Sequence, residues 1–368
     1  MEFLDYDDLP PTIGDAIQDG EPIYTLPEDE RQPEMSLRAD EFYKLAEDRD
    51  WGHSNLGIKD LYDKGYRGKG VVIAICDTGV SVNHPDLKSR IVEVGNKDFT
   101  GSNSGFLDRQ GHGTHCAGIA AASANNQGII GVAPEARIMA VKVLNDQGSG
   151  ASSWIAAGIR WAADNGADII SLSLGGPSPD AATRVAVQYA ASKGCWVVCA
   201  AGNDGREANS YPGHYPDSIA VVATDRENRR ASFSTINSQN DVAAPGVSIL
   251  STLPDGRYGT MSGTSMATPY VSGCLALVRG AIKAAGKAIP NQSQMIELLH
   301  KESNDIPPEG VDKQTGGGLI HTARLIKLLT KESAPPGPGP EPEPTPSPTV
   351  ITLKPGERVV VEAAQTTP

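Results

Sequence analysis

Residues 152–174, SSWIAAGIRWAADNGADIISLSL, join a helical pattern to a nearly continuous apolar run. The helical part spans 152–166 and ends in Gly166, and glycine is a common helix stop. The run that follows, 167–174, is apolar on both faces, as in a strand that is buried on both sides of a sheet. This stretch therefore predicts a helix followed by a buried strand.

The same alternation extends in both directions along the chain. A second helical segment is DAATRVAVQYAASKG (180–194), which also ends in Gly. Strands alternating with helices indicate an α/β fold, with a mostly parallel central β-sheet and helices on both faces. In such sheets ligands bind at the carboxyl ends of the strands. The other apolar runs are VVIAIC (71–76), IMAVKVL (138–144), WVVCAA (196–201) and SIAVVAT (218–224).

Changes in composition divide the chain into four parts. Residues 1–45 form a leader that is rich in Asp, Glu and Pro and shows little periodicity. Residues 46–330 carry the α/β pattern and form the main domain. Residues 331–349 are a Pro-rich linker, which favours an extended and semi-rigid spacer. Residues 350–368 alternate like β-strands but are too few to hold a core alone.

The formal net charge of −13 argues against nucleic acid or an anionic membrane as a partner. No apolar stretch approaches the ~20 residues that a membrane span needs. The first residues, MEFLDYDDLPPTIGD, lack a basic region and an apolar core, which favours an intracellular protein over a secreted one whose signal was removed. Five cysteines in apolar surroundings predict buried thiols and no disulfide framework. No sequence feature indicates an oligomeric state.

Asp77 opens the motif Asp-Thr-Gly directly after the first buried strand. A carboxylate at a strand end can accept a hydrogen bond from a histidine nitrogen. An ordinary turn explains the motif equally well. An aspartic-protease dyad is a further alternative, but it needs two such carboxylates, and the sequence has no second Asp-Thr/Ser-Gly.

His112 lies in Gly-His-Gly-Thr-His-Cys-Ala-Gly (111–118), at the start of a predicted helix. Its position after a glycine turn allows the ring to reach a partner. His112 and His115 are three residues apart, so they are also candidates for two ligands of a zinc ion. No HExxH pattern or further ligand set accompanies them, which disfavours zinc.

Ser265 lies in Ser-Gly-Thr-Ser-Met-Ala-Thr-Pro (262–269), at the first turn of a long apolar helix. Unpaired backbone N–H groups and the helix dipole favour negative charge there, so Ser265 is a candidate nucleophile, with a helix cap as the alternative. Asn203 ends the stretch Ala-Ala-Gly-Asn (200–203) after another buried strand. Its amide is a candidate donor to an oxyanion, and a simple strand-to-loop turn is the alternative.

Four segments together resemble the subtilisin (subtilase) family, with features of its proteinase K branch. The resemblance extends from about Trp51 to about Leu329, and the order Asp, His, Ser is that of the family. It implies a subtilisin-like serine endopeptidase that acts on proteins or peptides through an acyl-enzyme. The segments are CDTGVSVNHPDLK, GHGTHCAGIAA, AAGNDG and GTSMATPYVSG.

The resemblance also implies the role of each site residue. Ser265 is then the nucleophile, His112 the general base and Asp77 its partner, while Asn203 binds the oxyanion. Two segments match the family's groove for an extended substrate strand, Gly148-Ser149-Gly150 and Ser173-Leu174-Gly175. The first substrate pocket is expected to be roomy, with a broad or apolar-leaning preference for the substrate residue before the cleaved bond. It is expected to be lined by Ala200, Ala201 and Gly202, with Asp204 at its rim.

The resemblance further implies structural calcium. Asp86 and Asn125 match ligands of the family's strong calcium site, and Asp241 matches a ligand of a second site in the proteinase K branch. A surface loop without metal is the alternative. Tyr270 and Cys76 depart from residues that are usual in the family, and neither has a triad role. The leader does not resemble the family's compact propeptide, and we expect a short inhibitory pro-segment instead.

Two other functions compete with this one. A subtilase-like protein that only binds its ligands usually lacks a triad member, and here all three are present. An esterase of the α/β-hydrolase type needs Gly-x-Ser-x-Gly and the order Ser, Asp, His, and the sequence has neither. The sequence therefore favours a peptidase over both.

Overall fold

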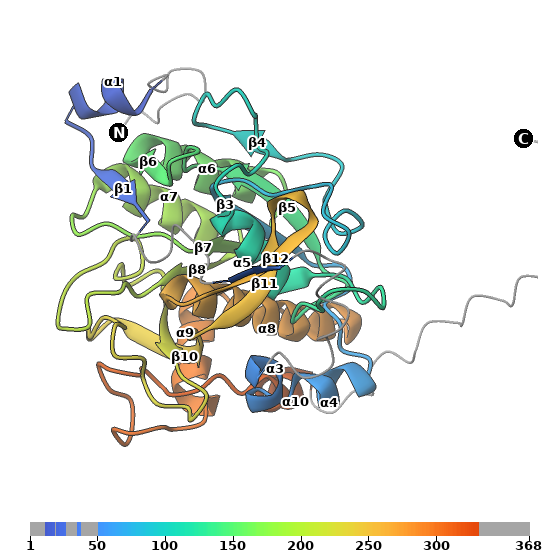
Figure 1. The fold of residues 1–368 in the computed structure, drawn as a ribbon. Helices are drawn as coiled ribbons and strands as arrows, with labels where there is room; N and C mark the ends of the chain where they lie inside the picture. Colours follow the sequence, from blue (N-terminus) through green and yellow to red (C-terminus); the bar gives the residue numbers. More distant parts are fainter. Residues whose placement is uncertain (1–11, 19, 27–34, 38–50, 331–368) are drawn as a thin grey trace, which may run out of the picture.

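A seven-stranded sheet with the strand order β10-β9-β8-β7-β3-β5-β4 forms the centre of the protein, and every neighbouring pair in it is parallel. The computed structural model describes residues 12–18, 20–26, 35–37 and 51–330 (Figure 1). The strands of this sheet are β3 (Val72–Asp77), β4 (Lys97–Asp98), β5 (Arg137–Lys142), β7 (Ile169–Leu172), β8 (Trp196–Ala200), β9 (Ile219–Thr224) and β10 (Asn240–Pro245).

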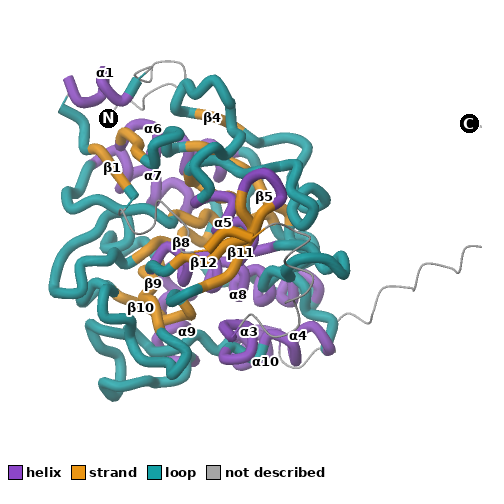
Figure 2. The backbone as a smooth tube through the Cα atoms, viewed as in Figure 1, coloured by secondary structure: helices purple, strands orange, loops and turns teal. Residues whose placement is uncertain are grey.

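Helices cover both faces of this sheet. Helices α6 (Ser152–Asp164) and α7 (Ala181–Ser192) lie on one face, and α5 (His112–Ala121) and α8 (Thr264–Ala284) lie on the other (Figures 1 and 2). The predicted α/β fold is therefore confirmed. Further helices of the described residues are α3 (Trp51–Asn55), α4 (Ile58–Asp63), α9 (Gln292–Glu302) and α10 (Thr322–Thr330), besides the short α1 described below.

Alternate residues of each central strand enter two different cores. In β3, Ile73 and Ile75 pack in the core beneath α5 and α8, whereas Ala74 and Cys76 pack in the core beneath α6 and α7. Full burial of an Ile side chain stabilises a fold by about 1.5–3 kcal/mol. Because both faces are buried, both sets of positions must be apolar, which explains the continuous apolar runs of the sequence.

Two smaller sheets were not apparent from the sequence. In one, β11 (Ile249–Leu253) and β12 (Arg257–Met261) form a hairpin around the short 3-10 helix Pro254–Gly256, and β2 (Met35–Leu37) pairs with β12. In the other, β1 (Ile23–Thr25) pairs with β6 (Ser149–Ala151), after the short helix α1 (Ile13–Gln18). The leader thus supplies one strand to each of these sheets. The predicted linker and C-terminal segment, 331–368, lie outside the described residues.

The five cysteines are all buried, and none forms a disulfide, as the sequence predicted. Burial raises the pKa of the Cys195 thiol to about 11 and that of the Cys274 thiol to about 12. Such thiols stay protonated near neutral pH. Among the described residues, no helix is both long and apolar enough to cross a membrane.

Candidate active site

Asp77 and His112 form a buried pair at the carboxyl edge of the sheet. Asp77 is the last residue of β3, and His112 is the first residue of α5. The ring Nδ1 of His112 lies 2.8 Å from Oδ1 and 3.0 Å from Oδ2 of Asp77. Because a carboxylate only accepts, Nδ1–H is the donor. The strand and the helix approach closely at Gly113, where a Cβ would overlap the carbonyl oxygen of Gly79.

The two neighbouring histidines of α5 have opposite electrostatic surroundings. Burial acts to lower the pKa of His112, but the adjacent Asp77 carboxylate outweighs it and holds that pKa well above its usual value. Burial lowers the pKa of His115 to about 3. The Nε2 of His115 lies 3.0 Å from the carbonyl oxygens of both Ile249 and Gly259, so its ring is directed at the β11–β12 hairpin. These contacts do not favour a zinc site shared by the two histidines.

Ser265 is the second residue of α8 and is buried beside the start of α5. Its hydroxyl donates to the carbonyl oxygen of Ser173 at 3.2 Å, and the Ser173 hydroxyl donates to the carbonyl oxygen of Ser265 at 2.8 Å. The Sγ of Cys116 lies 3.5 Å from the carbonyl oxygen of Ser265 and 3.9 Å from Nδ1 of His112. One thiol therefore contacts the backbone of Ser265 and the ring of His112.

Asn203 lies in the loop after β8, next to the start of α8. Its Oδ1 accepts hydrogen bonds from the Thr264 backbone N–H at 3.0 Å and from the Thr264 hydroxyl at 2.9 Å. Since a backbone N–H can only donate, the amide oxygen must face Thr264, and the Nδ2 group lies on the other side of the amide. Thr264 directly precedes Ser265, so the amide donor is held near the candidate nucleophile.

One side of the predicted groove, 148–150, is occupied by the leader. Strand β1 pairs antiparallel with β6, and the Leu26 N–H donates to the Gly148 carbonyl oxygen at 2.9 Å. Tyr24 has no exposed surface, and its hydroxyl donates to Oδ2 of Asp180 at 3.0 Å. The leader thus lies where the sequence predicts an extended substrate.

The other side of the groove, 173–175, follows β7. Ser173 contacts Ser265 as described, and Leu174 is buried. A Cβ on Gly175 would overlap the hydroxyl of Ser210, and a Cβ on Gly202 would lie 2.8 Å from the Ser210 Cβ. Ser210 therefore fills the space between these two glycines. Ser210 lies in no recognisable motif, because only its contacts with residues distant in sequence indicate a role.

The remaining residues predicted for the first pocket differ in exposure. Ala200 and Ala201 are buried, and Ala201 packs in the core with Val222. The Asp204 side chain is 40% exposed, and Nη2 of Arg206 lies 3.9 Å from its Oδ1. The guanidinium group of Arg206 therefore already lies near the Asp204 carboxylate at the predicted pocket rim.

Asp86 and Asn125, the predicted calcium ligands, are in contact. Asp86 is fully buried, and its Oδ1 accepts from Nδ2 of Asn125 at 3.0 Å. Its Oδ2 accepts from the Ile129 N–H at 3.0 Å and from the Tyr258 hydroxyl at 2.9 Å. These partners are all neutral, and the nearby His84 has a pKa lowered by burial. The amide group that faces Asp86 is the Nδ2 of Asn125, whereas its Oδ1 accepts from the Gln127 N–H at 2.9 Å, so in this arrangement the Asn125 side chain presents no oxygen toward the Asp86 carboxylate.

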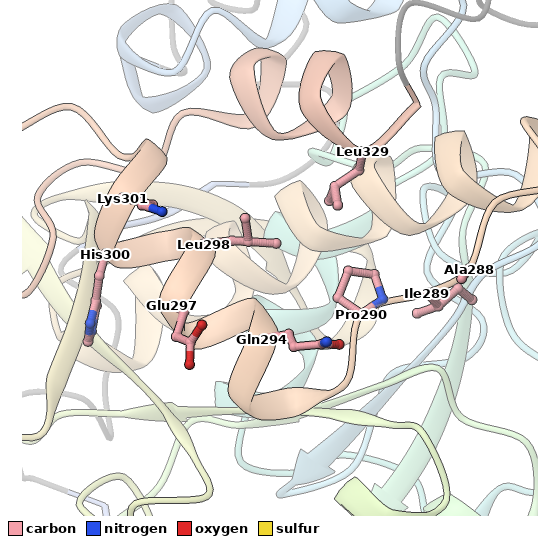
Figure 3. Close-up of a pocket in the computed structure, with 9 residues that line it drawn as sticks. All are labelled: Ala288, Ile289, Pro290, Gln294, Glu297, Leu298, His300, Lys301 and Leu329. Atoms are coloured by element: carbon pink, nitrogen blue, oxygen red, sulfur yellow. The ribbon is translucent and has the colours of Figure 1, made fainter.

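Asp241, predicted for a second calcium site, has other partners. Its Oδ1 lies 2.9 Å from Nε2 of His300, and its Oδ2 accepts from the Ala220 N–H at 2.8 Å. Burial raises the pKa of its carboxyl, although His300 acts in the opposite direction. His300 also lines a groove of about 650 Å³ beside α9, which Figure 3 shows and which contains none of the candidate catalytic or substrate residues.

Comparison with known proteins gives consistent matches. A model of the subtilase family matches residues 68–318. Thermitase of Thermoactinomyces vulgaris is 48% identical over 250 residues, which cover 68% of this chain and 87% of thermitase. An intracellular serine protease of Paenibacillus polymyxa is 42% identical over 271 residues, 71% of this chain and 82% of that protein. Subtilisin E of Bacillus subtilis is 46% identical over 241 residues, 64% of this chain and 62% of subtilisin E.

Proposed function

Because the chain belongs to the subtilase family and is a serine endopeptidase, we propose that Asp77, His112 and Ser265 form its catalytic triad. The observation that carries this proposal is the 2.8 Å contact between Nδ1 of His112 and Oδ1 of Asp77, in a buried pair beside Ser265. With Nδ1 donating to the carboxylate, Nε2 is the nitrogen that takes up a proton.

In the proposed reaction, Oγ of Ser265 attacks the peptide carbonyl carbon while Nε2 of His112 accepts the hydroxyl proton. Asp77 stabilises the imidazolium that forms, as the raised pKa of His112 indicates. His112 then donates the proton to the leaving amine, and an acyl-enzyme results. Water, activated by His112, hydrolyses the acyl-enzyme and restores Ser265.

The Nδ2 group of Asn203 and the backbone N–H of Ser265 stabilise the oxyanion in this proposal. The two hydrogen bonds from Thr264 to Oδ1 orient the amide before substrate binds. Such preorganised donors need no reorientation as charge develops on the oxygen. The start of α8 adds a favourable helix dipole.

Substrates of the proposed enzyme are proteins or peptides bound as an extended strand between segments 148–150 and 173–175. The antiparallel pairing of β1 with β6 supports this, because a substrate strand can use the same backbone groups. We propose a broad or apolar-leaning preference for the residue before the cleaved bond. Ser210, between Gly175 and Gly202, limits the depth of the first pocket. Ala200, Ala201 and Asp204 stay predicted members of this pocket.

We assign a structural calcium ion to Asp86 and Asn125. A carboxylate and an amide oxygen suit this hard cation, and the buried Asp86 has only neutral hydrogen-bond partners. Binding would require the Asn125 amide to turn, because its Nδ2 now faces Asp86 and its Oδ1 accepts from the Gln127 N–H. Bound calcium would compensate the buried charge and hold the loop rigid. Asp241 stays a predicted ligand of a second site, although His300 and Ala220 already contact its carboxylate.

Residues 1–45 are proposed as a short inhibitory pro-segment of a catalytic domain that spans 46–330. Support comes from the backbone bond between Leu26 and Gly148 and from the burial of Tyr24. Removal of the leader would open the groove to substrate. Full activity in a preparation whose leader is intact would contradict this proposal.

The test is hydrolysis of a chromogenic succinyl-Ala-Ala-Pro-Phe peptide by the wild type and by Ser265→Ala, before and after limited removal of the leader. We expect the wild type to cleave the peptide and Ser265→Ala to be inactive. A matched panel of amide and ester substrates separates a peptidase from an esterase. If Ser265→Ala retains activity, the proposed nucleophile is wrong. If neither protein cleaves any substrate, the groove only binds its ligands.

A further inference from the structure

Asp108 is a buried carboxylate to which the proposed reaction assigns no step. It is 4% exposed and lies just before α5. Its Oδ1 accepts from the Gly111 N–H at 2.8 Å, the Gln110 N–H at 2.9 Å and the Thr78 hydroxyl at 3.0 Å. Its Oδ2 accepts from the Thr114 hydroxyl at 2.6 Å and the Thr114 N–H at 2.9 Å. Five hydrogen bonds thus converge on one side chain.

These hydrogen bonds join the end of β3, which carries Asp77, to the start of α5, which carries His112. Thr78 directly follows Asp77, and its hydroxyl accepts from the Gly113 N–H at 2.9 Å while donating to Asp108. We propose that Asp108 is a positioning residue that fixes the His112 ring relative to the Asp77 carboxylate. This inference rests on the proposed triad and adds a residue that acts through it.

A role in the loop alone does not explain the full set of contacts. An aspartate that only stabilised the turn before α5 would need the bonds from Gln110 and Gly111, which form a common local motif. The bonds to Thr78 and Thr114 are additional and extend to the end of β3 and into the first turn of α5. The carboxylate therefore connects the strand end with the helix start.

The energetics favour a specific role as well. Burial raises the pKa of the Asp108 carboxyl, while the bonds from Thr114 and Gly111 act in the opposite direction. A buried carboxylate is costly unless its oxygens are fully hydrogen-bonded. Replacing one of its oxygens with an amide NH2 group leaves backbone N–H donors facing a donor, so the helix start can shift. Displacements of about 1 Å near a reacting group can lower rates by roughly 100-fold.

The test compares Asp108→Asn with Asp168→Asn in the full-length protein, after the same leader processing. Asp168 is a matched control, because it is also a buried carboxylate but lies before β7, at the opposite end of the sheet. It accepts from the Val72 N–H at 2.9 Å and pairs with Arg279 and Lys283. Both substitutions remove one buried negative charge and preserve side-chain shape.

We expect Asp108→Asn to lower kcat by about 10- to 100-fold with little change in KM. We also expect the acidic limb of its kcat/KM profile to move to lower pH, because His112 loses part of its contact with Asp77. Asp168→Asn should lower the thermal midpoint while leaving kcat and the pH profile of the folded enzyme unchanged. If Asp108→Asn behaves like Asp168→Asn, the inference is overturned.

A second pair of variants tests the positioning role of Asp108 if Asp108→Asn does not fold. Thr114→Val removes the hydroxyl that donates to Asp108 at 2.6 Å, and Thr114→Ser keeps a hydroxyl. We expect kcat and the pH limb to change in Thr114→Val and to be restored in Thr114→Ser; equal values in both overturn the inference. Ser265→Ala is measured alongside, so that failure of the proposed triad is distinguished from failure of the role of Asp108.

Discussion

Tyr24 offers the sharpest test of whether the leader blocks the groove. Its side chain has no exposed surface, and its hydroxyl donates to Asp180 at 3.0 Å. Replacing a buried aromatic side chain with Ala typically costs about 3–5 kcal/mol. Even about 3 kcal/mol corresponds to a roughly 100-fold rise in the population with an open groove. Tyr24→Phe removes only the hydrogen bond, which costs about 0.5–1.5 kcal/mol, or roughly a fivefold rise.

The assay is the initial rate of peptide hydrolysis by full-length protein, with the intact leader verified by mass spectrometry over the same minutes. We expect the initial rate to rise in the order wild type, Tyr24→Phe, Tyr24→Ala. Ile17→Ala is the matched control, because Ile17 lies in the same leader but is 60% exposed, and its rate should equal that of the wild type. Equal initial rates for Tyr24→Ala and the wild type, each with its leader intact, would refute the reasoning.

Three further predictions concern the oxyanion, the pH dependence and the metal. Asn203→Leu should lower kcat by about 100- to 1,000-fold with little change in KM in steady-state kinetics, and a change confined to KM would contradict its role. Asp77 raises the pKa of His112, and His112 is protonated and inactive as a base below that pKa. We therefore expect kcat/KM to rise as the pH increases through this elevated pKa. A kcat/KM that is independent of pH between about 5 and 10 would contradict this. A calcium chelator should lower the thermal midpoint of the wild type, since a ligand at 100 times its Kd adds about 2.7 kcal/mol to the free energy of unfolding. Asp86→Asn should have a lower midpoint that the chelator does not change. An unchanged wild-type midpoint would exclude the metal.

The central sheet was predictable because its signal is local. Strands β3, β5, β7, β8 and β9 each coincide with an apolar run, and α6 and α7 coincide with the two helical segments. Burial on both faces leaves little freedom in the choice of residues there. The leader strand β1 carries no such signal, because it depends on pairing with β6 far along the chain.

The candidate site divides in the same way. Asp77, His112, Asn203 and Ser265 belong to compact motifs at strand ends and helix starts, so their proximity follows from the topology of the sheet. The sequence signal for Asp108 is weaker, because it is only an acidic residue that lies three positions before Gly111 and the predicted helix.

Ser210 carries no local signal, because its contacts with Gly175 and Gly202 exist only in the folded protein. The orientation of the Asn203 amide likewise depends on Thr264, which lies far along the chain. Contacts between distant residues therefore limit what the sequence predicts.

The two leader strands have a consequence for colloidal behaviour. Strand β1 pairs with β6, and β2 pairs with β12, so the full-length chain satisfies backbone groups along both of these strands. A strand edge with unpaired N–H and C=O groups is a template for adding another chain, which promotes aggregation. Loss of the leader would expose two such edges at once. The full-length form should therefore tolerate high concentration better than the processed enzyme, whose exposed edges would recruit peptides and further copies of itself alike.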